Sequence, residues 1–191
     1  MSKILCKKDI ISIRDLSLVE VSYILKFAKK FKKNLPKKYL LDKIIAHCFF
    51  EPSTRTRLSF ETATLRLGGQ AIGFSGSENT SIKKGEDLHD TIKTISCYAD
   101  LIIIRHALEG SARLAAEISD KPIINAGDGA NQHPTQALAD LLTIQEMQGN
   151  LEGLSIALVG DLKYGRAVHS LAQLCALFNM RLFLISPSLL T

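Results

Sequence analysis

A cluster of hydroxyl and guanidinium groups lies between residues 51 and 61, where the sequence reads Glu-Pro-Ser-Thr-Arg-Thr-Arg-Leu-Ser-Phe-Glu. The apolar run 44–50 precedes this cluster and is typical of a buried strand. After the cluster, Leu58, Thr62 and Leu65 recur at near-helical spacing, which predicts a helix. The cluster therefore lies where a strand leads into the N-terminus of a helix.

The residues at this junction are Ser53, Thr54, Arg55 and Thr56. Unpaired backbone N–H groups and the positive end of the helix dipole favour an anion there. A serine or threonine at this position is also an ordinary N-cap residue. A cap does not require neighbouring guanidinium groups, however, and arginine offers a planar charged fork that matches phosphate or carboxylate. We therefore predict an oxyanion site rather than a plain cap.

A second polar cluster occupies residues 125–136, between the apolar run 122–124 and an evident helix. Pro134 fits the first turn of that helix, where its missing N–H costs nothing. This placement puts His133 and Gln136 at the carboxyl ends of the strands, where α/β proteins bind ligands. A lone histidine is more often structural, but its polar, Gly-rich loop favours a role in a site.

Two quieter segments lie between these clusters. The run 101–105 has the pattern of a buried strand and ends in Arg105, which we expect at the same sheet edge as Ser53 and His133. The segment 75–86 is small, polar and long for a connection. It is either a mobile surface loop or a functional one.

The chain as a whole alternates between strand and helix patterns, which predicts an α/β fold: a doubly wound, mostly parallel sheet with helices on both faces. The predicted strands lie near 44–50, 71–74, 101–105 and 122–126. The predicted helices lie near 54–67, 86–98, 110–119 and 134–147. Residues 1–150 then form one domain, and residues 151–191 begin a second α/β domain. That second part, with a strand near 154–160, a helix near 166–178 and a strand near 181–185, is too short to be a complete domain.

Composition excludes several classes of protein. The chain is 46% hydrophobic and 23% charged, and it has neither a membrane-length apolar run nor a signal-peptide pattern at its start. Its four cysteines lack the spacing of a zinc site or a disulfide framework, so we expect reduced core residues in a cytoplasmic protein. They are Cys6, Cys48, Cys97 and Cys175. No cluster of His, Cys and acidic residues has metal-ligand spacing.

Positive charge is concentrated at the start of the chain. Residues 1–43 hold 12 Lys and Arg against 4 Asp and Glu, although the whole chain carries only +5. A capping box at Ser17 and Glu20 opens a helix there, and the helix has one apolar stripe. The stripe consists of Val21, Ile24, Leu25, Ala28 and Phe31, and the lysines form the opposite, solvated face. We therefore expect no nucleic-acid partner.

Together these motifs resemble the aspartate/ornithine carbamoyltransferases, and most closely the aspartate branch. The run Ser-Thr-Arg-Thr-Arg marks the superfamily. The uninterrupted run 51–61, Ser81 followed by Lys83 and Lys84, and the run Val-Gly-Asp-Leu-Lys-Tyr-Gly-Arg at 159–166 resemble the aspartate enzymes. The resemblance covers essentially the whole chain and implies transfer of a carbamoyl group from carbamoyl phosphate to the α-amine of L-aspartate, in pyrimidine biosynthesis.

The resemblance also implies a role for each site residue. Phosphate binding falls to Ser53, Thr54, Arg55 and Thr56. Polarisation of the carbonyl oxygen falls to Arg105, His133 and Thr56. Gln136 would hold the carbamoyl NH2, and Arg166 would bind a carboxylate of aspartate. Glu51 would tether the two domains by pairing with arginine.

The family's assembly implies a homotrimer with shared active sites. Ser81 and Lys84, or Lys83 in its place, would reach into a neighbouring subunit's site, where the lysine would contact both substrates. Regulatory chains are a further partner within this family. No metal or organic cofactor is implied. Two alternatives stay open: a non-catalytic module that binds carbamoyl phosphate, and a transferase for another amine such as ornithine.

Overall fold

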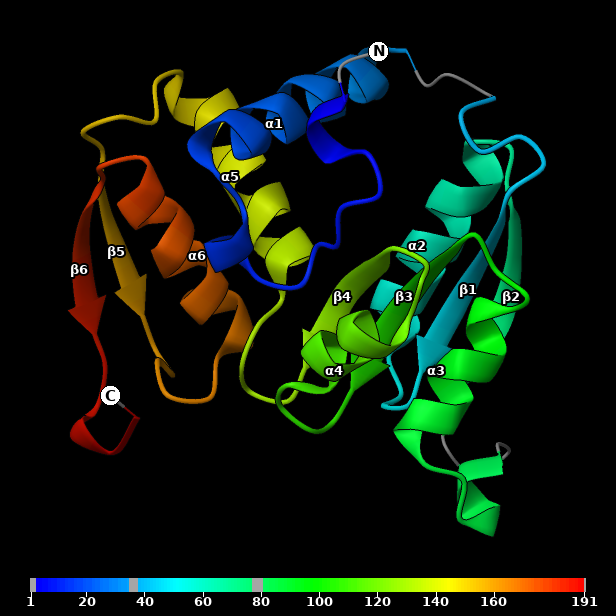
Figure 1. Ribbon diagram of the computed structural model, residues 1–191. Helices are drawn as coiled ribbons and strands as arrows, with labels where there is room; N and C mark the ends of the chain where they lie inside the picture. The colour runs from blue at the N-terminus through cyan, green and yellow to red at the C-terminus, as the bar shows by residue number, and fades with distance from the viewer. Residues whose placement is uncertain (1–2, 35–37, 77–80, 191) are drawn as a thin grey trace.

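The computed structural model describes residues 3–34, 38–76 and 81–190. Its larger sheet has four parallel strands in the order β2-β1-β3-β4. These strands are β1 (Ile44–Phe49), β2 (Gln70–Ser75), β3 (Leu101–His106) and β4 (Ile123–Asp128). Because all four run in one direction, their carboxyl ends meet at one edge of the sheet (Figure 1).

Helices cover both faces of this sheet, as expected for near-continuous apolar strands such as Leu-Ile-Ile-Ile in β3. On one face, α3 (Leu88–Ser96) and α4 (Ser111–Ile118) pack over a core that includes Cys48, Ile102 and Ile104. On the other face, α2 (Thr54–Arg66) packs over Ile45, Phe49 and Ile103. Figure 1 shows α3 and α4 in front of the sheet and α2 behind it.

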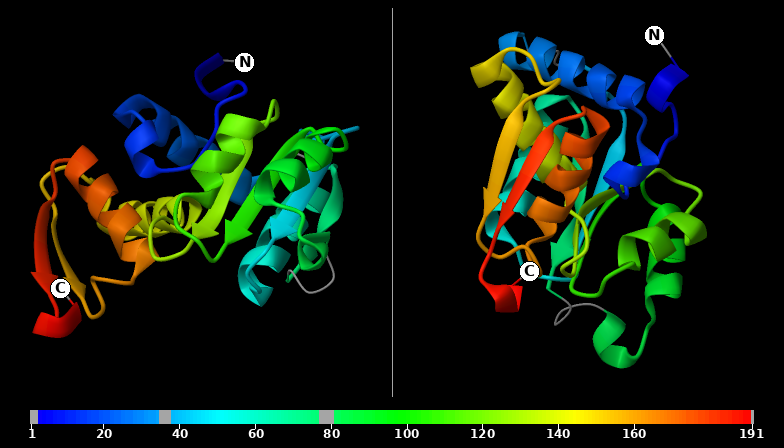
Figure 2. Two further views of the ribbon diagram at one scale, coloured as in Figure 1. Left: turned by 60° about the horizontal axis from the view of Figure 1, so that its bottom comes forward. Right: turned by 90° about the vertical axis from the view of Figure 1, so that its left-hand side faces the viewer.

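A second, smaller unit lies beside α5 (Pro134–Gln148). It consists of two parallel strands, β5 (Ser155–Val159) and β6 (Arg181–Ile185), joined by α6 (Arg166–Leu177). Helix α1 (Leu18–Lys33) packs with α5 and α6 around a third core. The two sheets lie on opposite sides of the α5–α6 layer (Figure 2, left).

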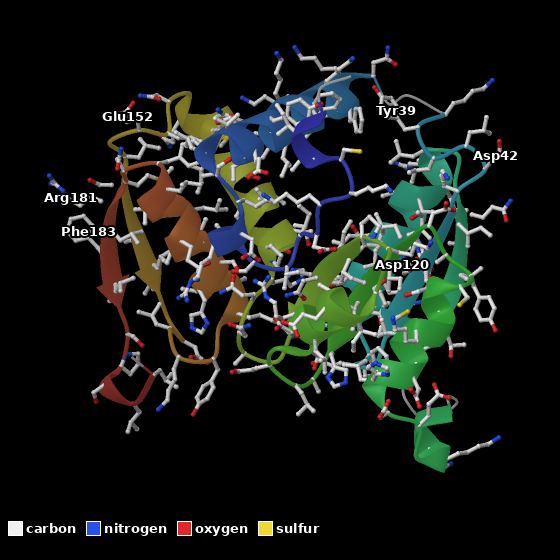
Figure 3. The ribbon with its side chains drawn as sticks, viewed as in Figure 1. Tyr39, Asp42, Asp120, Glu152, Arg181 and Phe183 are labelled. Carbon is white, nitrogen blue, oxygen red and sulfur yellow. The ribbon has the colours of Figure 1, made fainter. Side chains whose placement is uncertain are left out.

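The smaller sheet is covered incompletely. Parallel sheets are normally buried on both faces, yet Phe183 on β6 is 50% exposed and Val159 at the end of β5 is 71% exposed. Arg181 and Phe183 point outward from β6 (Figure 3). Only the face toward α6 contributes to the shared core, through Ile156 and Leu182.

The predicted α/β fold is confirmed, and each predicted element lies within about two residues of an observed one. The capping box at Ser17 and Glu20 forms as expected, and Val21 and Leu25 are buried. The division into domains at residue 150 stays a prediction. Within the described ranges, no helix is long and apolar enough to cross a membrane.

The expectation that all four cysteines lie in the core was wrong for two of them. Cys48 and Cys175 are buried, whereas Cys6 and Cys97 are exposed. Cys6 lies near the start of the chain, beyond the packed helices, and Cys97 ends α3 at the surface. All four are free thiols.

The third core predicts that the two units unfold together. Leu174 on α6 is 0% exposed and packs in the core shared with α1 and α5. Leu174→Ala should lower the free energy of unfolding by about 2–5 kcal/mol, because it removes buried methyl groups and leaves a cavity. Urea denaturation checks this. Leu189→Ala, at a residue that is 83% exposed, is the matched control. An equal effect of the two changes would contradict the shared core.

Candidate active site

The candidate site is a cavity of about 880 Å³ that opens at the carboxyl edge of the four-stranded sheet. Residues from the starts of α2, α5 and α6 and from the end of β3 line it, so three helix N-termini converge on one space. Helix N-termini and arginine side chains both favour an anion. The lining residues are Ser53, Arg55, Thr56, Ser59, Phe60, Ala63, Arg105, His133, Thr135, Gln136, Ala139, Asp140, Arg166 and Ala167.

The first predicted cluster faces this cavity through Ser53, Arg55 and Thr56. Ser53 is the N-cap residue of α2, but its side chain makes no capping hydrogen bond. Its hydroxyl is therefore available to a ligand. The second arginine of the motif is used differently: Arg57 Nε donates to Glu61 Oε1 at 2.6 Å, one turn along the helix, and Arg57 does not line the cavity.

Arg105 and Arg166 lie side by side with Glu51 between them. Arg105 Nε is 3.3 Å from Glu51 Oε2, in an ion pair without hydrogen-bond geometry, and Arg166 Nη1 donates to the same oxygen at 3.3 Å. Arg105 is only 9% exposed, and burial, followed by the charge of Arg166, lowers its pKa. An arginine nevertheless stays charged. The pair therefore forms a concentrated, partly unsatisfied positive centre.

Glycine is required where these two guanidinium groups approach the backbone. Gly127 has φ +119°, and a Cβ there would lie 3.2 Å from Arg166 Nη1 and 3.4 Å from Arg105 Nη1. Arg166 Nη1 also donates to the Gly129 carbonyl at 2.9 Å. The glycine near the end of β4 thus lets two cations pack against the backbone.

A buried polar network holds the loop that follows β4. Asn125 donates through Nδ2 to Asp128 Oδ1 at 2.8 Å and to the Ile11 carbonyl at 3.0 Å. The same carboxylate oxygen accepts from the Gln132 N–H at 3.2 Å. Both Asn125 and Asp128 are almost fully buried. A satisfied network of this kind rigidifies the loop and so positions His133 at its end.

His133 is the N-cap residue of α5, with Pro134 at the first helical position, as predicted. Its backbone N–H donates to Ser170 Oγ on α6 at 3.0 Å, which ties the loop to the second unit. Burial, assisted by the charges of Arg105 and Arg166, lowers the pKa of the His133 imidazole to about 4. The ring is therefore neutral at pH 7 and offers one N–H donor and one acceptor.

Gln136 faces the cavity one residue beyond Thr135. Its Nε2 donates to Asp140 Oδ1 at 2.9 Å, one turn further along α5. Asp140 also lines the cavity and is the one acid among the lining residues.

Three predicted site residues are not brought to the cavity within one chain. Thr54 begins α2 but is exposed and does not line the cavity. Ser81 and Lys84 belong to the 3-10 turn Ser81–Lys84, which lies beyond the start of α3 (Figure 1), and Lys84 does not line the cavity. Part of the predicted loop, residues 77–80, lies outside the described residues.

The sequence argument missed several polar residues of the site, among them Ser59 and Thr135, which line the cavity. Asp128 and Gln132 lie inside the predicted loop, where their buried network was not foreseen. Asp140 stands four residues after Gln136, a helical spacing that was a usable signal. Ser170 gave no local signal, because its partner His133 lies 37 positions away.

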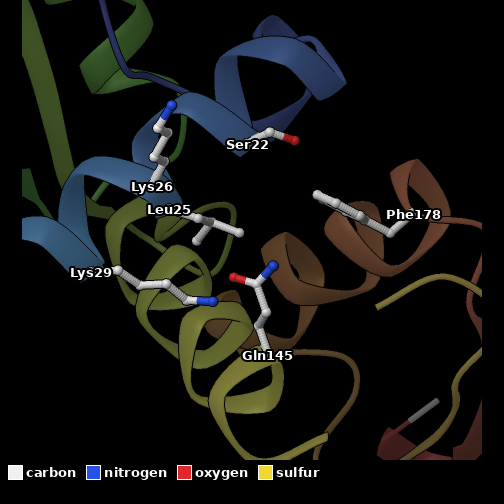
Figure 4. A pocket seen from close by; sticks show the side chains of 6 residues that line it. All are labelled: Ser22, Leu25, Lys26, Lys29, Gln145 and Phe178. Carbon is white, nitrogen blue, oxygen red and sulfur yellow. The ribbon is translucent and has the colours of Figure 1, made fainter. Parts of the chain in front are cut away.

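Two other features have some of the properties of a site. A cavity of about 290 Å³ lies between α1, α5 and Phe178, where Lys29 extends toward Gln145 and Lys26 extends away (Figure 4). It has neither arginine nor a helix N-terminus. At the start of α3, Asp87, His89 and Asp90 lie close enough to hold a cation, which the sequence spacing did not indicate. All three are exposed and Asp87 already caps α3, so we assign no metal there.

The chain matches the family described as "Aspartate/ornithine carbamoyltransferase, carbamoyl-P binding domain" over residues 8–146. The aspartate carbamoyltransferase catalytic subunit of Thermococcus kodakarensis is 58% identical over 187 residues, covering 96% of this chain and 60% of that subunit. The subunit of Chromobacterium violaceum is 56% identical, covering 96% and 61%.

Solved structures of aspartate transcarbamoylases are also similar to this chain. The catalytic subunit of M. jannaschii aspartate transcarbamoylase has a TM-score of 0.87 at 51% identity, covering 96% of this chain and 61% of that one. Aspartate transcarbamoylase from Trypanosoma cruzi, in complex with carbamoyl phosphate and aspartate, has a TM-score of 0.91 at 40% identity, covering 97% and 60%. This chain thus spans about 60% of the length of these relatives.

The environment of His133 predicts a pH-dependent stability. The folded chain holds this imidazole at a pKa of about 4, against 6.5 for an ordinary histidine. The unfolded chain therefore binds the proton more readily, and stability should fall as the pH drops from about 6.5 toward 4. Urea denaturation at pH 7 and pH 5 should show this loss, and His133→Gln should make it smaller. An unchanged pH dependence would mean that His133 is not held neutral by its surroundings.

Proposed function

Because the chain belongs to the aspartate/ornithine carbamoyltransferase family, we propose that its cavity binds carbamoyl phosphate and that the complete protein transfers the carbamoyl group to the α-amine of L-aspartate. The products are N-carbamoyl-L-aspartate and phosphate, as in pyrimidine biosynthesis. The observation that carries this proposal is the convergence of Arg55, Arg105 and His133 on one cavity with three helix N-termini.

Phosphate recognition is assigned to the start of α2. Ser53, whose hydroxyl makes no capping bond, Arg55 and Thr56 line the cavity at the start of the helix. The side chain of Thr54 does not line the cavity. We therefore assign to Thr54 only a contact through its backbone, in the same helical turn. Charge-assisted hydrogen bonds of this kind are the strong ones, and they neutralise the charge that the departing phosphate gains.

Carbonyl polarisation is assigned to Arg105, His133 and Thr56. The amine of aspartate attacks the carbonyl carbon, negative charge grows on the carbonyl oxygen, and the C–O bond to phosphate breaks. Donors already in place stabilise that charge without reorganisation. The neutral His133 ring supplies one N–H, and the Thr135 hydroxyl lies 3.5 Å from its Nδ1. Gln136 accepts from the carbamoyl NH2, which a cation cannot do.

Aspartate is proposed to bind where the two units meet. Arg166, at the start of α6, presents its guanidinium to the cavity and pairs with Glu51, which joins α6 to the end of β1. Lys84 and Ser81 are assigned to the site of a neighbouring subunit in a cytoplasmic homotrimer. Their position away from the cavity of their own chain supports this assignment.

The two arginines of the motif allow a sharp binding test. Arg55→Ala should weaken the binding of inorganic phosphate and of carbamoyl phosphate at least tenfold at low salt, because it removes a charge-assisted contact with the anion. Arg57→Ala removes the same charge from a residue that is paired with Glu61 and does not line the cavity, so it should change binding about threefold or less. Calorimetry on the 191-residue chain measures both. Equal losses in the two variants would refute the assigned phosphate site.

The shared-site assembly is tested by mixing inactive chains. In the full-length protein, Arg55→Ala and Lys84→Ala should each abolish most activity. Mixed trimers should regain activity, because some sites combine an intact Arg55 with a neighbour's intact Lys84. Ion exchange separates the mixed species, and a carbamoyl-aspartate assay measures them. If mixed trimers form but stay as inactive as their parents, the lysine acts within its own chain.

A further inference from the structure

One acidic side chain faces a cavity that is otherwise cationic. Asp140 lines the same space as Arg55, Arg105 and Arg166. A carboxylate there repels the anion that those arginines attract. Unlike Glu51, Asp140 has no recorded ion pair with either Arg105 or Arg166 among the described residues. Its presence therefore requires another explanation.

The contact that Asp140 does make is directional. Its Oδ1 accepts from Gln136 Nε2 at 2.9 Å. An ionised carboxylate can only accept hydrogen bonds, whereas a carboxamide has one accepting end and one donating end of almost the same shape. The carboxylate therefore selects one of the two orientations of the Gln136 amide: the NH2 group turns toward Asp140, and Oε1 turns away from it.

This orientation decides what Gln136 can recognise. Both side chains line the cavity, so an oxygen directed away from Asp140 is an acceptor available to a ligand. With the opposite orientation, the amide would offer a donor to the cavity and would suit a carbonyl or phosphate oxygen instead. In a cavity already rich in donors from arginines and helix N-termini, an acceptor is the scarce group.

We propose that Asp140 is a positioning residue: it fixes the Gln136 amide with its oxygen toward the ligand, so that the site selects an acyl phosphate bearing an NH2 group over one bearing a methyl group. The proposal rests on the proposed function, since it deepens the recognition of the carbamoyl group. It gives a reason for placing a negative charge beside an anion site. The repulsion is the cost of a directional contact that discriminates between neutral groups of similar size.

A plain helix-stabilising pair is the competing explanation. Gln and Asp at positions i and i+4 stabilise exposed helices slightly wherever they occur. That role predicts an effect on helix stability and none on ligand choice. The two explanations therefore differ in a measurable quantity, the ratio of affinities for two ligands that differ only at the NH2 position.

Two stable phosphonates supply that pair of ligands. Phosphonoacetamide carries the NH2 group, and 2-oxopropylphosphonate carries a methyl group in its place; a methylene replaces the labile anhydride oxygen in both. Calorimetry on the 191-residue chain should show that phosphonoacetamide binds about five to ten times more tightly, the usual worth of one hydrogen bond. Gln136→Ala should reduce this preference to less than twofold.

Asp140→Ala should also reduce the preference to less than twofold, although Gln136 is still present. Asp140→Asn should give an intermediate preference, because an asparagine allows both orientations of the Gln136 amide. Both changes should leave the affinity for inorganic phosphate equal or higher, since a repelling charge is gone. The double change Gln136→Ala with Asp140→Ala should be no worse than Gln136→Ala alone, because the two residues act as one unit.

Asp120→Asn is the matched control. Asp120 precedes β4, at the opposite edge of the sheet from the cavity, and is exposed (Figure 3). Asp120→Asn also removes one negative charge, but it should leave the preference for phosphonoacetamide over 2-oxopropylphosphonate unchanged. Urea midpoints verify that each variant is folded, and Asp140→Asn carries the test if Asp140→Ala does not fold.

The outcomes separate the two proposals. A wild-type chain that binds both phosphonates with a clear preference, and keeps that preference in Asp140→Asn and Asp140→Ala, overturns the role of Asp140 while the proposed function stands. A wild-type chain that binds both ligands equally removes the acceptor role of Gln136 and therefore the inference as well. A wild-type chain that binds neither ligand nor inorganic phosphate overturns the proposed function together with the inference.

Discussion

The site depends on two guanidinium groups held next to each other by one carboxylate. Arg105 is the penultimate residue of β3 and Arg166 begins α6, and each lies 3.3 Å from the same oxygen of Glu51. Without that acid, their repulsion in a partly buried space would separate the elements that carry them. The neutralisation is incomplete, because two positive charges face one negative charge. Burial, assisted by this excess, lowers the pKa of the neighbouring His133 to about 4, and the excess leaves a net attraction for an anion. The attraction for an anion and the junction of the two units thus depend on the same three side chains.

The backbone imposes a second constraint. Parallel strands end at one edge of the sheet, so the loops that follow them must fit into the same space. The Asn125–Asp128 network satisfies the polar groups of the loop after β4, and Gly127 leaves room for both guanidinium groups. The start of α2 uses the space differently. Its N-cap Ser53 leaves its own hydroxyl unbonded, which costs the helix a cap and supplies a group for a ligand. The helix therefore lacks a stabilising cap at the point where the cavity has a free hydroxyl group.

Most of the fold could be predicted from the sequence, because buried parallel strands are continuous apolar runs and the connecting helices carry clear start signals. Ser53, Arg55, Arg105, His133 and Gln136 could be predicted for a related reason: each lies directly after a strand pattern or in the first turn of a helix. What could not be predicted depends on partners distant in the chain. Ser170 meets His133 only because α6 packs against α5, and Arg57 is withdrawn from the cavity by Glu61. The exposure of Cys6 and Cys97 likewise depends on how the chain packs.

The residues that line the cavity come from both units of the chain. The groups assigned to carbamoyl phosphate come from α2, β3 and the start of α5, all on the side of the four-stranded sheet. The smaller unit contributes Arg166 and Ala167, the first residues of α6, and Glu51 and the Gly129 carbonyl hold the Arg166 guanidinium. The outward face of that smaller sheet remains open at Phe183 and Val159. The proposed contacts with phosphate therefore come from the well-packed part of the molecule, whereas the proposed contact with aspartate comes from the part whose packing is incomplete. A ligand that touched Arg105 and Arg166 together would link the two units, because each of these arginines is paired with Glu51.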